Sequence, residues 1–329
     1  MDIRDAKQQV IKAGQELCQS GLIARTWGNV SCRTGEDSFV ITASGRNYMT
    51  LTDDEVIEVK ISDLSYEGDI KPSSEKKVHR EIYRLKPEAN FVIHTHQNNA
   101  SAVSAMGVSQ ITLDKEYPSI GDKILCAEYG LPGTKKLCFN TAEAVKASDG
   151  KAIIMKHHGA VCYGRDYDEA FEVAHVLEEA CGRYLESIGV ESWVQEWSGN
   201  KQQDDYQNCT LWNKSPLVLK FTEEQKILKP YLDDFAQLAG TKLKVTDSEE
   251  EIKKAMNENT PILVKGKGAL CVATRQGDRE ALYMVIEKNC RAFFAAQAYT
   301  NGAAGKPIKS WECALMRQIY LKKYSKLGE

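Results

Sequence analysis

The sequence predicts a mixed α/β protein, and three observations support this fold class. Short apolar runs typical of strands occur at residues 39–42, 56–59, 91–96 and 152–159. Segments with apolar residues at helical spacing occur at residues 5–20, 71–85 and 168–189. The length of 329 residues, with 42% hydrophobic and 27% charged residues, suits one large globular domain or two ordinary ones. The alternation of strands and helices gives the class, but it leaves open whether the sheet is parallel.

Each predicted helix has its own local signals. The first places Val10, Gly14 and Leu17 on one face, and Gly21 suits its end. In the segment KPSSEKKVHREIYRL, Pro72 prevents continuation from upstream, and either serine that follows can act as N-cap. The longest helix, residues 168–189, carries its apolar residues along one face.

Composition excludes several classes of function. The net charge of −3 gives no reason to expect a nucleic acid or an anionic membrane as partner. The beginning of the chain has no apolar core of a signal peptide, and no run reaches the roughly 18–20 residues that span a bilayer. Ten scattered cysteines without a C-x-x-C pair are then interpreted as reduced, mostly buried thiols, and the protein as cytoplasmic.

The histidines predict a metal site. His94 and His96 are two apart in a strand, so their side chains project from the same face. Two imidazoles that point at one spot are a common start of a site for Zn²⁺ or a similar divalent ion; two hydrogen-bonded histidines without a metal are the alternative, and a third ligand would decide for the metal. A third ligand would come from His157 or His158, of which only one can reach the metal because neighbouring residues face opposite sides of a strand. His175 is interpreted as a core histidine.

Three short segments are candidates for anion binding. They are GNVS (28–31), TASG (42–45) and KPSSE (71–75), which combine small-residue turns, hydroxyls and a helix start. The dinucleotide and nucleoside-triphosphate fingerprints G-x-G-x-x-G and G-x-x-x-x-G-K-[ST] are absent from the sequence, so neither class of ligand has sequence support.

Taken together and in this order, GNVS, TASG, KPSSEKKVHREIYR, HTH (94–96) and KAIIMKHHGAVCYG (151–164) resemble the class II aldolase/adducin family, from residue 5 to about 190. The resemblance implies a three-layer α/β/α domain with a largely antiparallel central sheet, usually in a homotetramer. It is closest to the aldolases that cleave a ketose 1-phosphate into dihydroxyacetone phosphate and an aldehyde, through an enediolate stabilised by a divalent metal. The expected cofactor is therefore Zn²⁺, Mn²⁺, Co²⁺ or Fe²⁺, and the expected partners are a phosphorylated sugar and copies of the same chain.

The resemblance also implies roles for individual residues. The metal ligands would be His94, His96 and His158, and Glu75 would be the catalytic carboxylate. The family's proton-donating tyrosine comes from a neighbouring subunit; here Tyr117 is the nearest candidate, although it aligns only with a gap and Lys115 falls closer. The phosphate of the substrate would be bound by the residues of the three turns, namely Gly28, Asn29, Ser44, Gly45, Ser73 and Ser74.

Other reactions of the same family, and a function without catalysis, stay open. The family also contains dehydratases that act on methylthioribulose 1-phosphate, which use a glutamate as here, and sugar-phosphate epimerases, which carry aspartate at the position of Glu75. A non-enzymatic assembly protein on an aldolase scaffold is the alternative from another class. The intact set of histidines favours the enzyme.

The sequence after about residue 205 predicts a second segment that is related to the first. AIIMKHHGAVCYG (152–164) and PILVKGKGALCVA (261–273) share five of thirteen residues, and LEEACGRY (177–184) parallels IEKNCRAF (286–293) at the same offset of 109 residues. Residues 1–200 carry 22 Lys and Arg against 30 Asp and Glu, net −8, whereas residues 201–329 carry 21 against 16, net +5. We expect a catalytic domain at 1–205 and, at 206–329, a smaller α/β half-repeat that lacks metal ligands and catalysis and packs where a second subunit of the tetramer would. The alternative is an unrelated α/β extension whose similarity reflects only common strand–turn–helix patterning.

Overall fold

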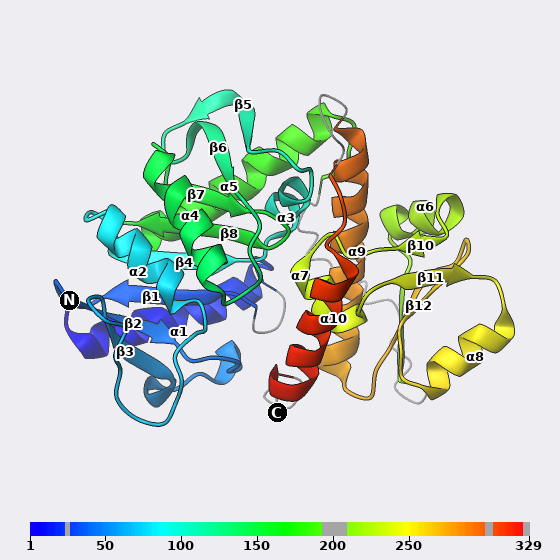
Figure 1. Cartoon of the computed structure of the whole chain (residues 1–329), viewed down its shortest axis with the longest axis horizontal. Coiled ribbons are helices and arrows are strands. Elements are labelled where there is room, and N and C mark those ends of the chain that lie inside the picture. Colours follow the sequence, from blue (N-terminus) through cyan, green and yellow to red (C-terminus); the bar gives the residue numbers. More distant parts are fainter. Residues whose placement is uncertain (24–26, 193–208, 300–304, 325–329) are drawn as a thin grey trace.

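A computed structural model describes residues 1–23, 27–192, 209–299 and 305–324 of the chain. These residues form two α/β segments, each with its own sheet, of eight and five strands (Figure 1). The mixed α/β class predicted from the sequence is confirmed. The predicted boundary between residues 205 and 206 lies outside the described residues.

The larger sheet is mostly antiparallel, as the family resemblance implied. Its strands are β1 (Asn29–Arg33), β2 (Ser38–Thr42), β3 (Val56–Lys60), β4 (Phe91–Thr95), β5 (Gln110–Tyr117), β6 (Gly121–Ala127), β7 (Ala152–Met155) and β8 (Gly159–Gly164). They lie in the order β3-β2-β1-β4-β8-β7-β6-β5. Among these strands, every neighbouring pair is antiparallel except β6 and β7.

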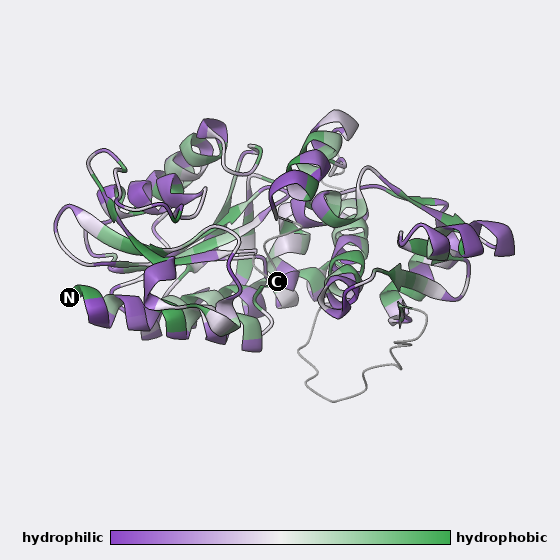
Figure 2. Ribbon diagram, turned by 90° about the horizontal axis from the view of Figure 1, so that it is seen from below, coloured by the Kyte–Doolittle hydropathy of each residue, from purple (hydrophilic) through white to green (hydrophobic). Residues whose placement is uncertain are grey.

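Within the described part of the chain, five helices of the first segment cover the two faces of this sheet. They are α1 (Ile3–Gln19), α2 (Lys76–Leu85), α3 (Asn98–Ser104), α4 (Lys135–Ala147) and α5 (Tyr167–Ser187). Apolar residues of α1, α3 and α5 form one core with the sheet, and those of α2 and α4 form the other. The result is the three-layer α/β/α arrangement, with apolar strands between helices whose outer faces are polar (Figure 2).

The second segment is smaller and lies against the first. Its strands are β9 (Thr210–Asn213), β10 (Ile227–Leu228), β11 (Leu243–Thr246), β12 (Ile262–Val264) and β13 (Gly268–Val272), in the order β10-β11-β12-β13-β9. Its helices are α6 (Pro216–Glu224), α7 (Asp233–Ala239), α8 (Glu249–Asn257), α9 (Gln276–Ala298) and α10 (Ser310–Ile319). Helices α9 and α10 lie between the two sheets (Figure 1), and α9 contacts α3 of the first segment.

The two segments share an order of elements. In the first, β6-α4-β7-β8-α5 has a parallel β6–β7 pair and an antiparallel β7–β8 pair; in the second, β11-α8-β12-β13-α9 has the same two relations. The turns before β8 and β13 also agree, because His157 (φ 60°) and Gly266 (φ 63°), 109 residues apart, are both left-handed. This correspondence supports the internal repeat, which we retain as a proposal.

Some element boundaries differ from the sequence prediction. The strand expected at 152–159 ends at Met155, because the left-handed His157 turns the chain. Helix α2 begins after Glu75 rather than after a serine, since the hydroxyl of Ser73 accepts a hydrogen bond from the backbone N–H of Glu75 in the preceding turn. His175, expected in the core, is exposed on α5.

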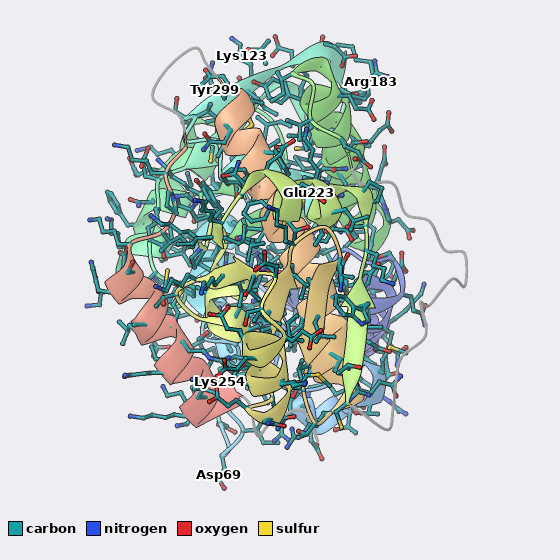
Figure 3. All side chains as sticks on the ribbon, turned by 90° about the vertical axis from the view of Figure 1, so that its right-hand side faces the viewer. Asp69, Lys123, Arg183, Glu223, Lys254 and Tyr299 are labelled. Atoms are coloured by element: carbon teal, nitrogen blue, oxygen red, sulfur yellow. The ribbon has the colours of Figure 1, made fainter. Side chains whose placement is uncertain are left out.

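Charged side chains lie at the surface and most thiols are buried, as expected of a globular protein. Charged side chains such as Asp69, Lys123 and Lys254 project from the periphery (Figure 3). All ten cysteines belong to the described part of the chain; none of them forms a disulfide, and eight are buried. Within the described residues, no helix combines the length and the apolar character that crossing a bilayer requires.

Candidate metal centre and substrate cavity

The end of β4 and the turn between β7 and β8 bring three histidines together. His94 lies near the end of β4, and His96 follows it on the same face of the sheet. His158 directly precedes β8, which is the hydrogen-bonded neighbour of β4. The left-handed backbone of His157 directs its own side chain away, so that its Nδ1 donates to the carbonyl of Tyr231 at 2.9 Å. His158 is therefore the member of the pair that faces the other two.

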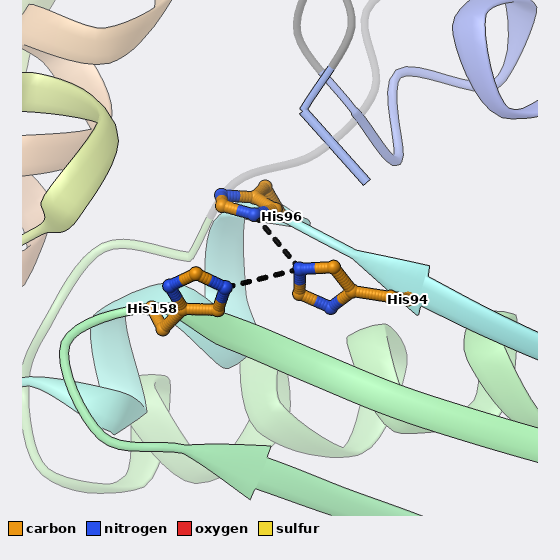
Figure 4. Close-up of side chains that lie close together, drawn as sticks. All are labelled: His94, His96 and His158. Atoms are coloured by element: carbon orange, nitrogen blue, oxygen red, sulfur yellow. Dashed lines mark hydrogen bonds between the residues drawn. The ribbon is translucent and has the colours of Figure 1, made fainter. Parts of the chain in front are cut away.

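The imidazoles point their Nε2 atoms at one another (Figure 4). Nε2 of His94 lies 3.0 Å from Nε2 of His96 and 3.1 Å from Nε2 of His158. All three side chains are almost fully buried. On the outer side, Nδ1 of His94 donates to the carbonyl of Ala160 at 2.8 Å, which fixes the orientation of that ring. Among the described residues, this cluster is the one group of side chains that could hold a metal ion.

Glu75 completes the cluster from the start of α2. Its Oε2 lies 3.2 Å from Nε2 of His94, and its Oε1 lies 3.2 Å from Nε2 of His158. The amide of Asn29 donates to Oε2 at 3.2 Å, and the carbonyl oxygen of that amide is hydrogen-bonded to Nε2 of His79. Both polar atoms of Asn29 are thus engaged within the chain, so the structure favours a role in holding Glu75 over direct contact with a phosphate.

Burial and nearby charges shift the pKa values in opposite directions. Burial lowers the pKa of His94 to about 4 and that of His96 to about 3, so both imidazoles are neutral, which is the form that binds metals. Burial would also lower the pKa of His158, but the carboxylates of Glu75 and Asp233 outweigh it and raise the pKa to about 10. Burial raises the pKa of Glu75, yet His94 and His158 hold it well below its usual value.

The buried side chains around the histidines carry an excess of negative charge. Glu75, Asp233 and Asp234 carry three negative charges, and Lys288 carries one positive charge, which leaves −2. A proton on His158 compensates part of this charge, whereas a divalent ion would compensate all of it. Two nitrogens bound to one tetrahedral Zn²⁺ at about 2.0–2.1 Å lie roughly 3.3 Å apart, close to the 3.0 and 3.1 Å between Nε2 of His94 and those of His96 and His158. The residues present therefore suit a divalent metal.

A cavity of about 440 Å³ opens beside this cluster. This volume is within the range of small-molecule sites, which is about 300–1,000 Å³. The cavity is lined by Glu75 and the three histidines and by all six residues predicted to bind phosphate, which are Gly28, Asn29, Ser44, Gly45, Ser73 and Ser74. None of the described lining residues is Lys or Arg, so an anion would be held by hydroxyls and by the backbone of the turns.

Gly28 is required where the cavity meets β4. Its φ is +119°, and a Cβ atom there would lie 2.7 Å from the carbonyl oxygen of His94 and 2.8 Å from a methyl group of Ile23. We expect Gly28→Ala to lower the free energy of unfolding by about 2–4 kcal/mol, from strain and collision together, as measured by urea unfolding.

The control for this variant is Gly189→Ala. Gly189 also has a positive φ, +77°, but its Cβ would meet nothing within 4 Å. We expect a cost of about 1–2 kcal/mol there, from backbone strain alone. Equal costs at the two positions would contradict the close approach of Gly28 to β4.

Tyr117 is not brought to this site. It lies at the end of β5, on the edge strand of the sheet, and it does not line the cavity. Its hydroxyl is buried without a hydrogen-bond partner, and its ring belongs to the core on the α5 side of the sheet. Within one chain, Tyr117 is therefore not placed with the other site residues, because the segment 111–123 forms a β5–β6 hairpin at the edge of the sheet, away from β4. Its role as a proton donor to a neighbouring subunit stays a prediction.

Several residues near the site were not predicted from the sequence. Asp233, Asp234 and Lys288 come from the second segment and contact the histidines. Gln237, Gly277, Glu280, Ala281, Met284 and Tyr320 of that segment also line the cavity. The one local signal was the acidic pair in YLDDFAQL, which lies between apolar residues in a segment expected to lack catalysis.

Fold and site now define the class of protein. Residues 8–185 match the family described as class II aldolase and adducin N-terminal domain, and the chain belongs to this family. A curated relative is the L-fuculose phosphate aldolase of Escherichia coli (strain K12), which is 31% identical over 198 residues that cover 58% of this chain and 87% of the relative. The corresponding protein of Shigella flexneri matches equally well.

Solved structures agree with this assignment. One described as L-fuculose 1-phosphate aldolase aligns with a TM-score of 0.53 and 26% identity, over 58% of this chain and 90% of that one. YgbL from Klebsiella pneumoniae aligns with a TM-score of 0.52 and 22% identity, over 57% of this chain and 92% of that one, and shows the same fold. Each of these matches covers little more than half of this chain, so the chain carries additional sequence beyond the part that they share.

Proposed function

We propose that this protein is a metal-dependent aldolase that cleaves a ketose 1-phosphate into dihydroxyacetone phosphate and an aldehyde. The observation that carries the proposal is the convergence of His94, His96 and His158 beside Glu75, in a cavity whose lining includes the three turns predicted to bind an anion. A non-enzymatic scaffold would have no need to bury these polar groups together, because burying them costs free energy.

The three imidazoles would hold a divalent metal through their Nε2 atoms. Three protein ligands leave a coordination position free, as in catalytic metal sites. When bound, the metal supplies Lewis-acid stabilisation of the negative charge that develops as the carbon–carbon bond breaks. The resemblance to the family supports this ligand set, residue by residue.

Glu75 would move the proton at the reacting carbon. Its carboxylate lies beside the histidine cluster and also lines the cavity. It can therefore reach a substrate that fills the cavity and extends to the histidines. The hydrogen bond from Asn29 holds one carboxylate oxygen, and the other stays directed at the cluster. A carboxylate placed in this way acts as general base in one direction and as general acid in the other.

The turns at the other walls would hold the phosphate. Ser44 and Gly45 follow β2, and Ser73 and Ser74 precede α2. Binding of the non-reacting end positions the reacting carbons beside Glu75 and the histidines. The relatives named above act on L-fuculose phosphate, so L-fuculose 1-phosphate is the first substrate to test.

The test combines elemental analysis with a retro-aldol assay. We expect about one divalent metal per wild-type chain and release of dihydroxyacetone phosphate from L-fuculose, rhamnulose or ribulose 1-phosphate. In His158→Ala, both the metal and the activity should be lost, because one of three ligands is removed. Freshly purified protein without a metal, and without activity after metal is added, would contradict the proposal.

A dehydratase of the same family is the second candidate. It keeps the carbon chain intact and so does not need the group that, in cleavage, takes the proton from the hydroxyl that becomes the aldehyde; Tyr117, the candidate for that group, does not line the cavity of its own chain. Mass spectrometry of the products separates the two reactions. Loss of water from an intact carbon chain would indicate the dehydratase, whereas two shorter fragments indicate the aldolase.

A further inference from the structure

The outer nitrogens of the three histidines face acceptors from different parts of the chain. Nδ1 of His94 faces a backbone carbonyl of β8, within the first segment. Nδ1 of His158 faces Asp233, and Nδ1 of His96 faces Asp234, both at the start of α7 in the second segment. Two of the three imidazoles are therefore backed by carboxylates from the segment expected to lack catalysis.

Asp233 is held from three sides. Its Oδ2 accepts from Nδ1 of His158 at 2.8 Å, and its Oδ1 accepts from the hydroxyl of Tyr129 at 3.1 Å. Its backbone N–H donates to the carbonyl of His157 at 2.9 Å, which ties the first turn of α7 to the turn that carries the ligand. The side chain is fully buried, so solvent does not compete for these bonds.

Asp234 is held by a buried lysine. Lys288 of α9 is 3% exposed and forms an ion pair with Oδ2 of Asp234. The same ammonium group donates to the backbone carbonyl of His96 at 2.9 Å. Oδ2 of Asp234 lies 3.7 Å from Nδ1 of His96, which has no hydrogen-bond partner among the described residues. A small movement of either side chain would close this gap.

Asp233, Asp234 and Lys288 are charged side chains buried where the two segments meet. Burying charges is costly, and apolar residues of similar volume would pack there at least as well. Each of the three contacts His96 or His158 or holds a residue that does. A carboxylate at Nδ1 keeps the proton on that nitrogen, which leaves the Nε2 lone pair free for a metal and makes it more basic. The arrangement therefore matches a requirement of the metal site.

We propose that the second segment is part of the metal centre, with Asp233 and Asp234 as positioning residues that orient His158 and His96. Tyr129 and Lys288 hold the two carboxylates in place. The inference rests on the proposed metal-dependent function and adds to it that the half-repeat, although it has no ligand of its own, sets the affinity for the metal.

The test is Co²⁺ binding to metal-free protein, followed through the visible absorption of the bound ion and without substrate. In Asp233→Asn, the side chain keeps its size, but its NH₂ group can donate to Nδ1 and so favour the tautomer with the proton on Nε2. We expect Co²⁺ to bind about 10–100-fold more weakly than in wild type, the usual effect of losing such a carboxylate. For Asp234→Asn we expect a loss of about 10-fold. Asp233→Glu should recover part of the affinity, which a merely structural role would not predict.

The matched control is Asp247→Asn, an exposed aspartate of the same segment, which should bind Co²⁺ as wild type does. Thermal unfolding of the metal-free proteins checks that the variants fold. If Asp233→Asn does not fold, Tyr129→Phe replaces it, with an expected loss of a few fold because Oδ1 loses its donor.

The outcomes separate this inference from the proposed function. Wild-type protein that fails to bind Co²⁺ would overturn both. Wild-type binding together with unchanged affinity in folded Asp233→Asn and Asp234→Asn, or in Tyr129→Phe where the first cannot fold, would overturn the positioning role and leave the metal-dependent function standing.

Discussion

The His94→Ala variant is expected to bind a divalent metal more than about 100-fold more weakly than wild type, because loss of a ligand exceeds the 10–100-fold cost of losing a residue behind one. His94 is central to the cluster, with its Nε2 within hydrogen-bond distance of both other Nε2 atoms. Since the metal's charge stabilisation is worth several kcal/mol, we also expect kcat/KM to fall by about 10³-fold or more at limiting metal. Isothermal titration with Zn²⁺ and the retro-aldol assay measure the two effects.

The control for this variant is His175→Ala. His175 is exposed on α5, so its removal should leave metal affinity and activity unchanged. A His94→Ala protein that folds and still binds one metal per chain with wild-type affinity would show that the three histidines are not the ligand set.

The first segment could be predicted from the sequence because its signals are local. The alternation of side chains along a strand placed His94 and His96 on one face, and the structure agrees. The three-layer fold followed from the resemblance, and the chain's own pattern predicted β2, β3, β4 and β7 to within a few residues but missed β5, β6 and β8. The turn at His157 was the local exception, since a left-handed histidine leaves no mark in the pattern of apolar residues.

The contribution of the second segment could not be predicted in the same way. Asp233 meets His158 across 75 positions of sequence, and Lys288 meets His96 across 192. The periodicity of apolar residues does not encode such contacts, because they depend on how the first and second segments pack against each other. The absence of histidines after His175 predicted a segment without ligands, which is a different property from having no part in the site.

The proton donor stays a prediction, because the family resemblance places it on a neighbouring subunit. Tyr117 follows the histidine segment by some twenty residues, but β5 carries it to the far edge of the sheet, away from β4. The number of chains in the assembly also stays a prediction. Light scattering would test whether the second segment, which lies against the site within one chain, lowers the number of subunits expected for the family.

The Glu75→Gln variant is expected to keep its metal and lose its turnover. The amide has the size of the carboxylate and can still contact the histidines and Asn29, but it can neither donate a proton to the reacting carbon during cleavage nor accept one in the reverse reaction. We expect kcat to fall by about 10²–10⁴-fold, the usual contribution of a general acid or base, with KM changed much less because the turns proposed to hold the phosphate are intact. Steady-state kinetics on the substrate found active in wild type, with metal content measured on the same samples, gives both quantities.

Metal content decides how this result is interpreted. Glu75 lies 3.2 Å from two of the three Nε2 atoms, so its carboxylate could serve the substrate or the metal. A lower kcat at full metal occupancy assigns it to proton transfer. A lower kcat that excess Zn²⁺ restores assigns it to metal binding and contradicts the role proposed for it. Glu58→Gln, an exposed glutamate on β3, is the matched control and should change neither quantity, so any loss seen at Glu75 belongs to its position beside the histidines.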